Sequence, residues 1–245
     1  EALQVTDKDY DQSPGSKYIL LIYNQESLNL ANINPNGSIP GWDNGATWNR
    51  EHTWPQSRGL NGTGSPDGSD LHHVRASRTS VNTAREETNF GGAFGTRPNG
   101  NLYGEFTNVQ GTFWYPGDAD AGWVARAQFY MAVRYDGTDS GTQDLELGNG
   151  AVTNVSGAND PPPQLGDLAS MIDWHFAATP DLFERRRHQI VFDDYQNNRN
   201  PFVDHPEFVC RFSWATRTTA ASRSPEQRLT AMAVPHGTST WAVCS

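Results

Sequence analysis

Residues 49–57 have the sequence N-R-E-H-T-W-P-Q-S, residues 70–77 have D-L-H-H-V-R-A-S, and residues 81–83 have V-N-T. The first segment contains β-branched and aromatic residues and favours a short strand that Pro55 ends. The second segment suits another strand, and Ser77 or Thr79 can cap a short helix after it. We therefore expect, within residues 46–88, strands over Thr47–Trp54 and Leu71–Ala76 and a helix over Val81–Glu87.

Three side chains of this stretch carry chemistry. His52 is a natural general base, because an imidazole with an unperturbed pKa of about 6.5 is mostly neutral at pH 7 and can take a proton from water. Glu51 and Asn82 supply oxygen atoms for a hard divalent cation such as Mg²⁺, which keeps several waters and needs one or two protein oxygens. Together they indicate metal-assisted attack of water on a phosphodiester. We expect the other ring nitrogen of His52 to be bonded to a backbone carbonyl.

Spacing alone leaves the relation between Glu51 and His52 open. Neighbouring residues of a regular strand point to opposite faces. The two side chains share a site only if the strand ends or is bulged here, and the nearby Pro55 allows an early end. In the alternative the two side chains diverge, and Glu51 pairs with an arginine.

The whole chain predicts an α+β fold in which helices predominate. No Ser/Gly/Pro linker separates two hydrophobic halves, so we expect one domain over residues 1–245. Helical spacing of apolar residues predicts four further helices, and one alternating segment predicts a strand. The helices are Lys17–Ala31, Asp118–Tyr135, Leu165–Ala178 and Asp181–Gln196, the strand is Phe208–Trp214, and Phe90–Gly117 is rich in loops.

The charge of the chain restricts how it could bind nucleic acid. A net charge of −10 argues against a protein that coats nucleic acid with a basic surface. Lys8 and Lys17 are the two lysines among 18 basic residues, so the other 16 are arginines. Arginine binds phosphate oxygens through two parallel hydrogen bonds, which lysine cannot do. We expect any contact with nucleic acid to be a local cleft lined by arginines.

Cys210 and Cys244 are the only cysteines. A disulfide between them would suit an exported protein, and two buried free thiols are the alternative. The sequence starts at Glu1 without a signal peptide, as a processed secreted form would. It has no apolar run of about 18 residues, so we expect no membrane-spanning segment.

Four blocks of sequence carry a family resemblance. They are R-E-H-T-W-P-Q-S, D-L-H-H-V-R-A-S, V-N-T-A-R and the later Q-N-N-R-N-P-F-V-D-H-P-E at residues 196–207. In this order they resemble the bacterial endonuclease I family of secreted or periplasmic nucleases, which belongs to the ββα-metal, or His-Me finger, superfamily. The four blocks are spread over about two-thirds of the chain.

The resemblance implies an endonuclease with little sequence preference that cuts DNA, and often RNA, to leave 5′-phosphate ends. Separately, we expect a monomer. It implies His52 as general base, and Glu51 and Asn82 as ligands of one Mg²⁺ or another hard divalent cation such as Mn²⁺ or Ca²⁺. It further implies that an arginine holds the scissile phosphate. Arg75 and Arg85 are our first choices because they flank the helix expected to carry Asn82, and Arg58 is a third.

Alternatives to this assignment remain. His72 and His73 could be zinc ligands, although their spacing from His52 matches no common zinc motif and no cysteine lies nearby. They could equally be structural histidines. The protein could also be a secreted nucleic-acid-binding protein that has kept the scaffold without the activity. A metal-dependent hydrolase of another phosphate ester is the third possibility.

Overall fold

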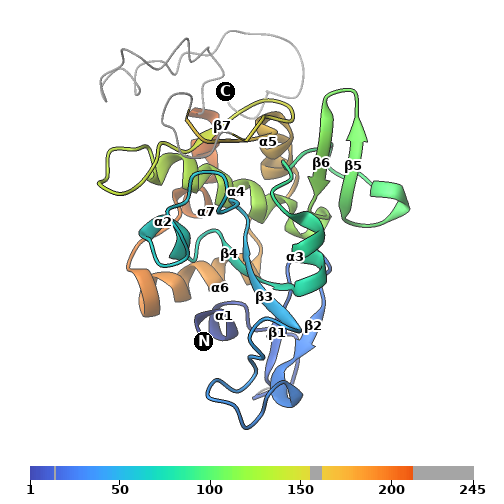
Figure 1. Cartoon of the computed structure of the whole chain (residues 1–245), viewed down its shortest axis with the longest axis vertical. Helices are drawn as coiled ribbons and strands as arrows, with labels where there is room; N and C mark the ends of the chain where they lie inside the picture. The colour runs from blue at the N-terminus through green and yellow to red at the C-terminus, as the bar shows by residue number, and fades with distance from the viewer. Residues whose placement is uncertain (14, 155–161, 212–245) are drawn as a thin grey trace.

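The computed structural model describes residues 1–13, 15–154 and 162–211, and these form an α+β fold (Figure 1). The described helices contain more residues than the described strands, so the expected fold class is confirmed. Every sheet in this part of the chain has two strands. The pairs are β1 (Tyr18–Leu20) with β2 (Ser27–Asn29), β3 (Trp48–His52) with β4 (Val74–Arg78), β5 (Gly104–Asn108) with β6 (Gly111–Tyr115), and β7 (Glu146–Leu147) with β8 (Gln164–Leu165).

Strands β3 and β4 and the helix after them form the scaffold that the sequence predicts. The strands are antiparallel, and helix α3 (Thr79–Arg85) follows β4 directly and contacts both. The loop between the strands contains the short helix α2 (Pro66–Ser69). Strand β4 begins at Val74 rather than Leu71, because a turn comes first in which the Asp70 carbonyl accepts the amide protons of His73 and Val74. The predicted order of strand, loop, strand and helix is confirmed.

Helix α4 (Asp118–Arg134) is the central helix and matches its expected bounds closely. Asp118 and Asp120 lie in its first turn, where carboxylates interact favourably with the helix dipole. The helix is buried on almost all sides and packs against α5 (Leu168–Ala177) and α7 (Pro201–Asp204). Three of its side chains bond to the segments around the β3–β4 scaffold. These bonds join Asp120 to Tyr23, Gln128 to Thr53, and Tyr130 to Asp70.

The helices near the C-terminal end of the described residues begin directly after residues whose side chains cap them. The side chain of Asp167 caps α5, and that of Asp181 caps α6 (Leu182–Ile190). The helix expected over Asp181–Gln196 continues beyond α6 as a π-helix, η3 (Val191–Gln196). The remaining short helices are α1 (Ala2–Thr6), η1 (Leu30–Asn32), η2 (Pro98–Gly100) and η4 (Pro206–Arg211).

The helix expected over Lys17–Ala31 is wrong. This segment forms the hairpin β1–β2 and the single turn η1. The amide of Leu20 donates to the Asp7 carbonyl and that of Ile22 to the Ala76 carbonyl, so distant partners take the bonds that a helix would use. A short buried apolar run cannot be assigned to helix or strand by its spacing alone.

Two other expectations need correction. The strand expected over Phe208–Trp214 is wrong for its first four residues, which lie in the 3₁₀-helix η4, and residues 212–214 lie outside the described residues. The segment Phe90–Gly117, expected to be rich in loops, also contains the β5–β6 hairpin, which the sequence did not predict. The expected Cys210–Cys244 disulfide stays a prediction, because Cys244 lies outside the described residues.

A buried ion network fastens the N-terminal segment to the scaffold. Asp7 is fully buried, and its two oxygens accept from Arg75 Nε at 2.9 Å and Arg187 Nε at 2.7 Å. Arg187 also donates to the carbonyls of Leu71 and Val74 at the start of β4. Burial by itself would raise the pKa of Asp7, but Arg187 and Arg75 outweigh it, and the pKa lies below its ordinary value.

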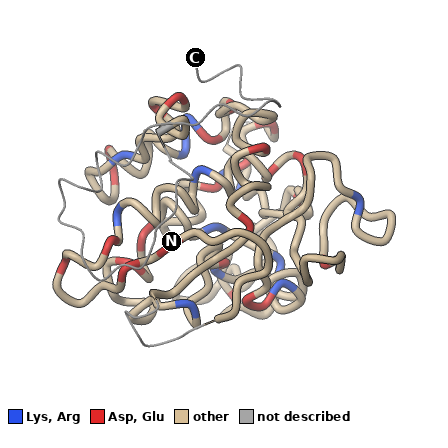
Figure 2. The backbone as a smooth tube through the Cα atoms, turned by 90° about the horizontal axis from the view of Figure 1, so that it is seen from above, with Lys and Arg blue, Asp and Glu red and all other residues tan. Residues whose placement is uncertain are grey.

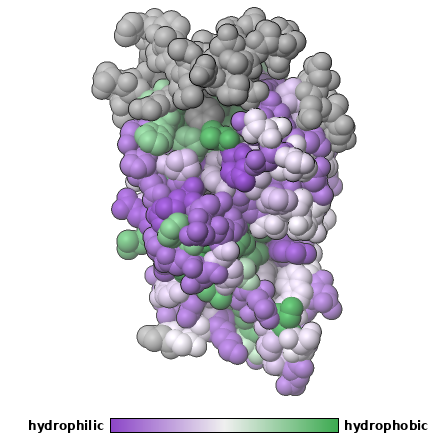
Figure 3. Space-filling model, turned by 90° about the vertical axis from the view of Figure 1, so that its left-hand side faces the viewer, coloured by the Kyte–Doolittle hydropathy of each residue, from purple (hydrophilic) through white to green (hydrophobic). Residues whose placement is uncertain are grey.

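Charged residues of both signs are spread along the chain rather than gathered into separate basic and acidic segments. Figure 2 shows lysines and arginines interspersed with aspartates and glutamates along the chain. The face shown in Figure 3 consists mostly of hydrophilic residues with small hydrophobic patches. Among the described residues, no helix combines the length and apolar character that crossing a bilayer requires.

Candidate active site

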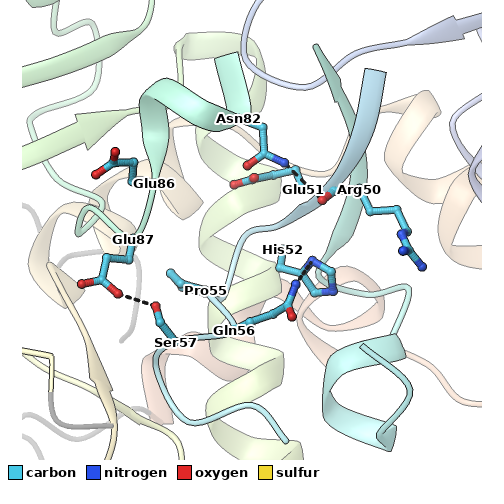
Figure 4. Close-up of a pocket in the computed structure, with 9 residues that line it drawn as sticks. All are labelled: Arg50, Glu51, His52, Pro55, Gln56, Ser57, Asn82, Glu86 and Glu87. Atoms are coloured by element: carbon cyan, nitrogen blue, oxygen red, sulfur yellow. Dashed lines mark hydrogen bonds between the residues drawn. The ribbon is translucent and has the colours of Figure 1, made fainter. Parts of the chain in front are cut away.

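A pocket of about 340 Å³ lies where β3, the turn after it and α3 meet (Figure 4). It brings together Glu51, His52 and Asn82, as the sequence predicts. The complete lining is Arg50, Glu51, His52, Pro55, Gln56, Ser57, Asn82, Glu86 and Glu87. Glu51 and His52 share the pocket because β3 ends at His52, so the alternation of a regular strand stops here.

His52 has two differently bonded ring nitrogens. Its Nε2 lies 2.9 Å from the carbonyl oxygen of Gly68 in α2, which confirms the expected bond to a backbone carbonyl. This bond places the proton on Nε2, so Nδ1 carries a lone pair and accepts from the Gln56 amide at 3.2 Å. Burial lowers the pKa of His52, and the ring is therefore neutral at pH 7.

Glu51 is held by two groups on one of its oxygens. The hydroxyl of Tyr23 donates to Oε1 at 2.7 Å, and Nη1 of Arg85 lies 3.6 Å from the same atom. The side chain is almost fully buried. Burial raises the pKa of Glu51, whereas Arg85 and Tyr23 act to lower it. A cation at this carboxylate would therefore be favourable.

Asn82 is oriented by its amide nitrogen. Nδ2 donates to Oδ1 of Asn49 at 2.8 Å and to the Arg50 carbonyl at 3.1 Å. No described residue donates to its Oδ1, or to Oε2 of Glu51. Two oxygen atoms on the pocket wall are thus left for a hard cation, which suits the Mg²⁺ site that the sequence predicts. The part of the chain that the structure describes contains no cluster of three His, Cys, Asp or Glu side chains placed to hold a metal.

The charge of the pocket differs from the expected arginine-lined cleft. Its lining contains one arginine, Arg50, against three glutamates, Glu51, Glu86 and Glu87. Glu87 accepts hydrogen bonds from the hydroxyl of Ser57 and from the Asn154 amide. Arg50 is exposed and lies on the side of the pocket opposite Glu86 and Glu87 in Figure 4. With one positive and three negative groups, the lining has a formal charge of −2.

None of the three predicted phosphate-binding arginines lines the pocket. Arg75 is buried in the ion pair with Asp7, and its guanidinium lies 4.9 Å from the ring centre of Trp123. Arg58 is also buried and donates to three backbone carbonyls, those of Glu87, Val152 and Gln164. Direct contact with substrate is not supported for these two residues, because their donors are already used inside the fold.

Arg85 stands behind the pocket rather than in its wall. Besides its contact with Glu51, it donates to the Thr53 carbonyl at 2.8 Å and lies over the ring of Phe90. It is almost completely buried. Its position suits the orientation of Glu51 and not a direct contact with a phosphate.

The histidine pair has structural bonding partners. His73 is completely buried, its Nε2 lies 2.8 Å from the Asp67 carbonyl, and its ring packs 5.5 Å from that of His52. Nε2 of His72 lies 3.1 Å from Oδ1 of Asn198. Burial lowers the pKa of His73 to about 3 and that of His72 to about 4, so both are neutral at pH 7. This bonding favours the structural alternative over zinc ligation.

The sequence did not single out three residues of this site. Gln56 bonds to the candidate base, Tyr23 bonds to Glu51, and Arg50 is the arginine of the lining. Gln56 and Arg50 lie within the block around Glu51 and His52, so proximity could have suggested them. Tyr23 is remote in sequence from that block, and no local signal predicts its contact.

Comparisons with known proteins show the family to which the chain is related. The family model described as Endonuclease I matches residues 1–207. An extracellular ribonuclease of Bacillus amyloliquefaciens is 40% identical over 205 residues, which are 82% of this chain and 64% of the relative. An extracellular ribonuclease of Bacillus subtilis (strain 168) is 39% identical over 210 residues, 85% of this chain and 65% of the relative. The matched part of the chain thus spans less than two-thirds of either relative.

Proposed function

Because the chain belongs to the endonuclease I family, we propose that it hydrolyses phosphodiester bonds of nucleic acid, with His52 as general base and a divalent ion on Glu51 and Asn82. The observation that carries the proposal is the pocket that holds these three side chains together. Strands β3 and β4 with helix α3 would then be the ββα-metal core that the resemblance implies.

The donor set supports a divalent cation in this pocket. Oε2 of Glu51 and Oδ1 of Asn82 are the ligands we assign, and a lining charge of −2 would be balanced by such an ion. When bound, Mg²⁺, Mn²⁺ or Ca²⁺ would offset the negative charge that develops on the phosphoryl and leaving oxygens. Without a cation, the three carboxylates would repel a phosphate.

The proton transfer belongs to His52. Nδ1 takes a proton from a water molecule that replaces the Gln56 amide, while the bond from Nε2 to Gly68 keeps the ring in place. The resulting hydroxide attacks phosphorus and the bond to the 3′-oxygen breaks. One product ends in a 5′-phosphate, and the other gains a proton from solvent to form a 3′-hydroxyl.

Arg50 replaces the three buried arginines as the candidate phosphate contact. It lines the pocket, its side chain is exposed, and it has no ion pair with a carboxylate of the described residues. A guanidinium can hold two phosphate oxygens at once. Arg50 would thus hold the substrate from the side of the pocket opposite Glu86 and Glu87.

We propose RNA and DNA as substrates. The relatives named extracellular ribonucleases favour RNA, and the family resemblance implies tolerance of both sugars. Their names also favour action outside the cytoplasm, in a secreted or periplasmic protein. We keep a monomer as the expected state.

The test is cleavage of closed circular plasmid and of a long RNA by the purified protein. We expect cleavage that EDTA abolishes and that Mg²⁺, Mn²⁺ or Ca²⁺ restores. Full activity in EDTA would refute the metal assignment. Binding without cleavage under every metal condition would favour the inactive binding protein. Cleavage of a simple phosphodiester such as bis(p-nitrophenyl) phosphate without cleavage of nucleic acid would favour the other phosphate-ester hydrolase.

A further inference from the structure

Tyr23 adopts a backbone conformation that large side chains rarely take. It follows the buried run at β1, and its φ of +75° lies in the left-handed region that favours glycine. The side chain is buried, with 2% of its surface exposed. A strained conformation at a bulky residue persists only where the surrounding structure holds it.

The surroundings of Tyr23 hold it from two directions. Its amide donates to Oδ2 of Asp120 in α4 at 2.7 Å, and the Gln25 side chain donates to the same oxygen at 2.6 Å. Its ring packs against Trp114 and Phe90, with ring centres 5.6 and 6.5 Å away. The backbone turn and the ring of Tyr23 are therefore both held in place by contacts that do not involve its hydroxyl.

The hydroxyl of Tyr23 then reaches Oε1 of Glu51 at 2.7 Å. Arg85 approaches this same oxygen, whereas Oε2 has no partner among the described residues. One oxygen of the carboxylate is thus anchored inside the protein and the other is available. This division is what a carboxylate that binds a metal through one oxygen needs.

We propose that Tyr23 is a positioning residue that anchors Oε1 of Glu51 so that Oε2 is presented to the divalent ion. The inference rests on the proposed function, because it requires the metal site. The strained turn at Tyr23 delivers the hydroxyl to Glu51, and Asp120 keeps the turn in place. A tyrosine that merely filled the core would need its ring and not its hydroxyl.

The experiment removes only the hydroxyl. We would compare wild type and Tyr23→Phe by direct Mn²⁺ binding, with the free-ion signal in electron paramagnetic resonance and with calorimetry. The variant should bind Mn²⁺ roughly tenfold to a hundredfold more weakly, the usual effect of losing an outer hydrogen bond to a ligand. At saturating Mn²⁺ its rate should return to near the wild-type value, with an unchanged KM for nucleic acid.

Tyr115→Phe is the matched control. The hydroxyl of Tyr115 is also bonded to a carboxylate, that of Asp118, and its ring packs against Trp174, but it lies outside the pocket. This variant should bind Mn²⁺ as wild type does. If Tyr23→Phe fails to fold, Asp120→Asn is the second variant, because it weakens the anchor of the turn without touching Glu51. A severalfold weaker affinity for Mn²⁺ is then expected.

The outcomes separate this inference from the function on which it rests. Mn²⁺ affinity of Tyr23→Phe within twofold of wild type would overturn the inference and leave the metal site intact. A wild-type protein that does not bind Mn²⁺ would overturn both. A wild type that binds Mn²⁺ without cleaving nucleic acid, together with a weaker Tyr23→Phe, would support the inference and overturn the proposed catalysis.

Discussion

The two ring nitrogens of His52 have different partners, and this difference makes a single substitution informative. Nε2 faces the Gly68 carbonyl and Nδ1 faces Gln56 at the pocket. The family resemblance implied His52, Glu51 and Asn82 as one site, whereas spacing alone left open whether Glu51 and His52 converge. It could not identify the arginine, because burial depends on distant partners such as Asp7, which occupies Arg75.

His52→Ala should lower the rate of cleavage by roughly 10²–10⁴, the usual contribution of a general base. Binding of nucleic acid should persist, because the phosphate contact and the metal ligands remain. Rates are measured on plasmid and RNA at saturating Mg²⁺, and binding by gel shift in Ca²⁺ and in Mg²⁺. The exposed His205, which lies outside the pocket, provides the control His205→Ala. Activity of His52→Ala within a few-fold of wild type would assign the base elsewhere.

Arg50→Ala should raise the KM for nucleic acid by about tenfold to a hundredfold, the effect of losing one charge-assisted bond to phosphate. The slope of log KM against log salt concentration should also decrease by about 1, which corresponds to the loss of one contact with phosphate. Arg185→Ala is the control, because Arg185 is exposed, lies outside the pocket and bonds to the Pro180 carbonyl rather than to a carboxylate. Equal KM values and salt slopes for Arg50→Ala and wild type would exclude the contact.

At the scale of elements, the long periodic helix α4 and the order β3, β4, α3 could be predicted, whereas the short hairpins β1–β2 and β5–β6 could not. Helix α4 has seventeen residues, and its apolar spacing places it within one residue of expectation at its C-terminal end. The segment of β1 and β2 was predicted as helix. Its apolar spacing does not reveal that Leu20 in β1 and Ile22 just after it bond to the distant carbonyls of Asp7 and Ala76. The turn between these strands contains no glycine, although Tyr23 and Gln25 both have positive φ. Glycine, which usually marks such a turn in a sequence, is therefore absent from this hairpin.

The buried ion network of Asp7, Arg75 and Arg187 joins the end of α1 to β4 and α6, and it gives a prediction for stability. Asp7→Asn leaves Arg75 and Arg187 buried without a counter-charge, and it should lower the free energy of unfolding by about 3–5 kcal/mol. The check is urea unfolding at pH 7. Asp139→Asn at the exposed pair with Arg134 should cost about 1 kcal/mol or less. Similar decreases in the free energy of unfolding for both variants would mean that the buried network contributes no more than an exposed ion pair.

The carboxylate of Asp7 also makes the stability of the protein depend on pH. The pKa of Asp7 is lower in the folded protein than in the unfolded chain, so the folded state releases this proton more readily. Its stabilisation is complete above the unfolded pKa of about 3.9 and is lost as the pH falls through the folded value. Wild type should therefore lose stability below about pH 4, and Asp7→Asn should lose less over that range. Parallel acid limbs for the two proteins would contradict this.

At the scale of the whole molecule, the net charge of −10 predicts that any contact with nucleic acid is local rather than spread over a basic surface. Composition predicted a local cleft lined by arginines, whereas the lining of the pocket contains one arginine and three glutamates. The reason lies in the buried arginines of the described residues, which pair with carboxylates or backbone carbonyls inside the fold. In the proposed function, a cation from solution takes the role that arginines were expected to have.

The disulfide prediction also belongs to this scale. Cys210→Ser should lower the melting temperature in oxidising buffer, because the bond would close a loop between residues 210 and 244 and contribute about 3–4 kcal/mol. In reducing buffer the variant and wild type should melt alike. The measurement is a pair of thermal scans with and without reductant. An equal decrease in both buffers would argue against a disulfide.

In the proposed function, the carboxylates of the pocket also determine the order in which the divalent ion and the nucleic acid bind. A polyanion and a lining that carries Glu51, Glu86 and Glu87 repel each other until a cation lies between them. The ion must therefore arrive first and the nucleic acid second. In rapid mixing, protein that has already met the ion should start to cleave at once. Protein mixed with nucleic acid before the ion is added should have formed no productive complex in advance.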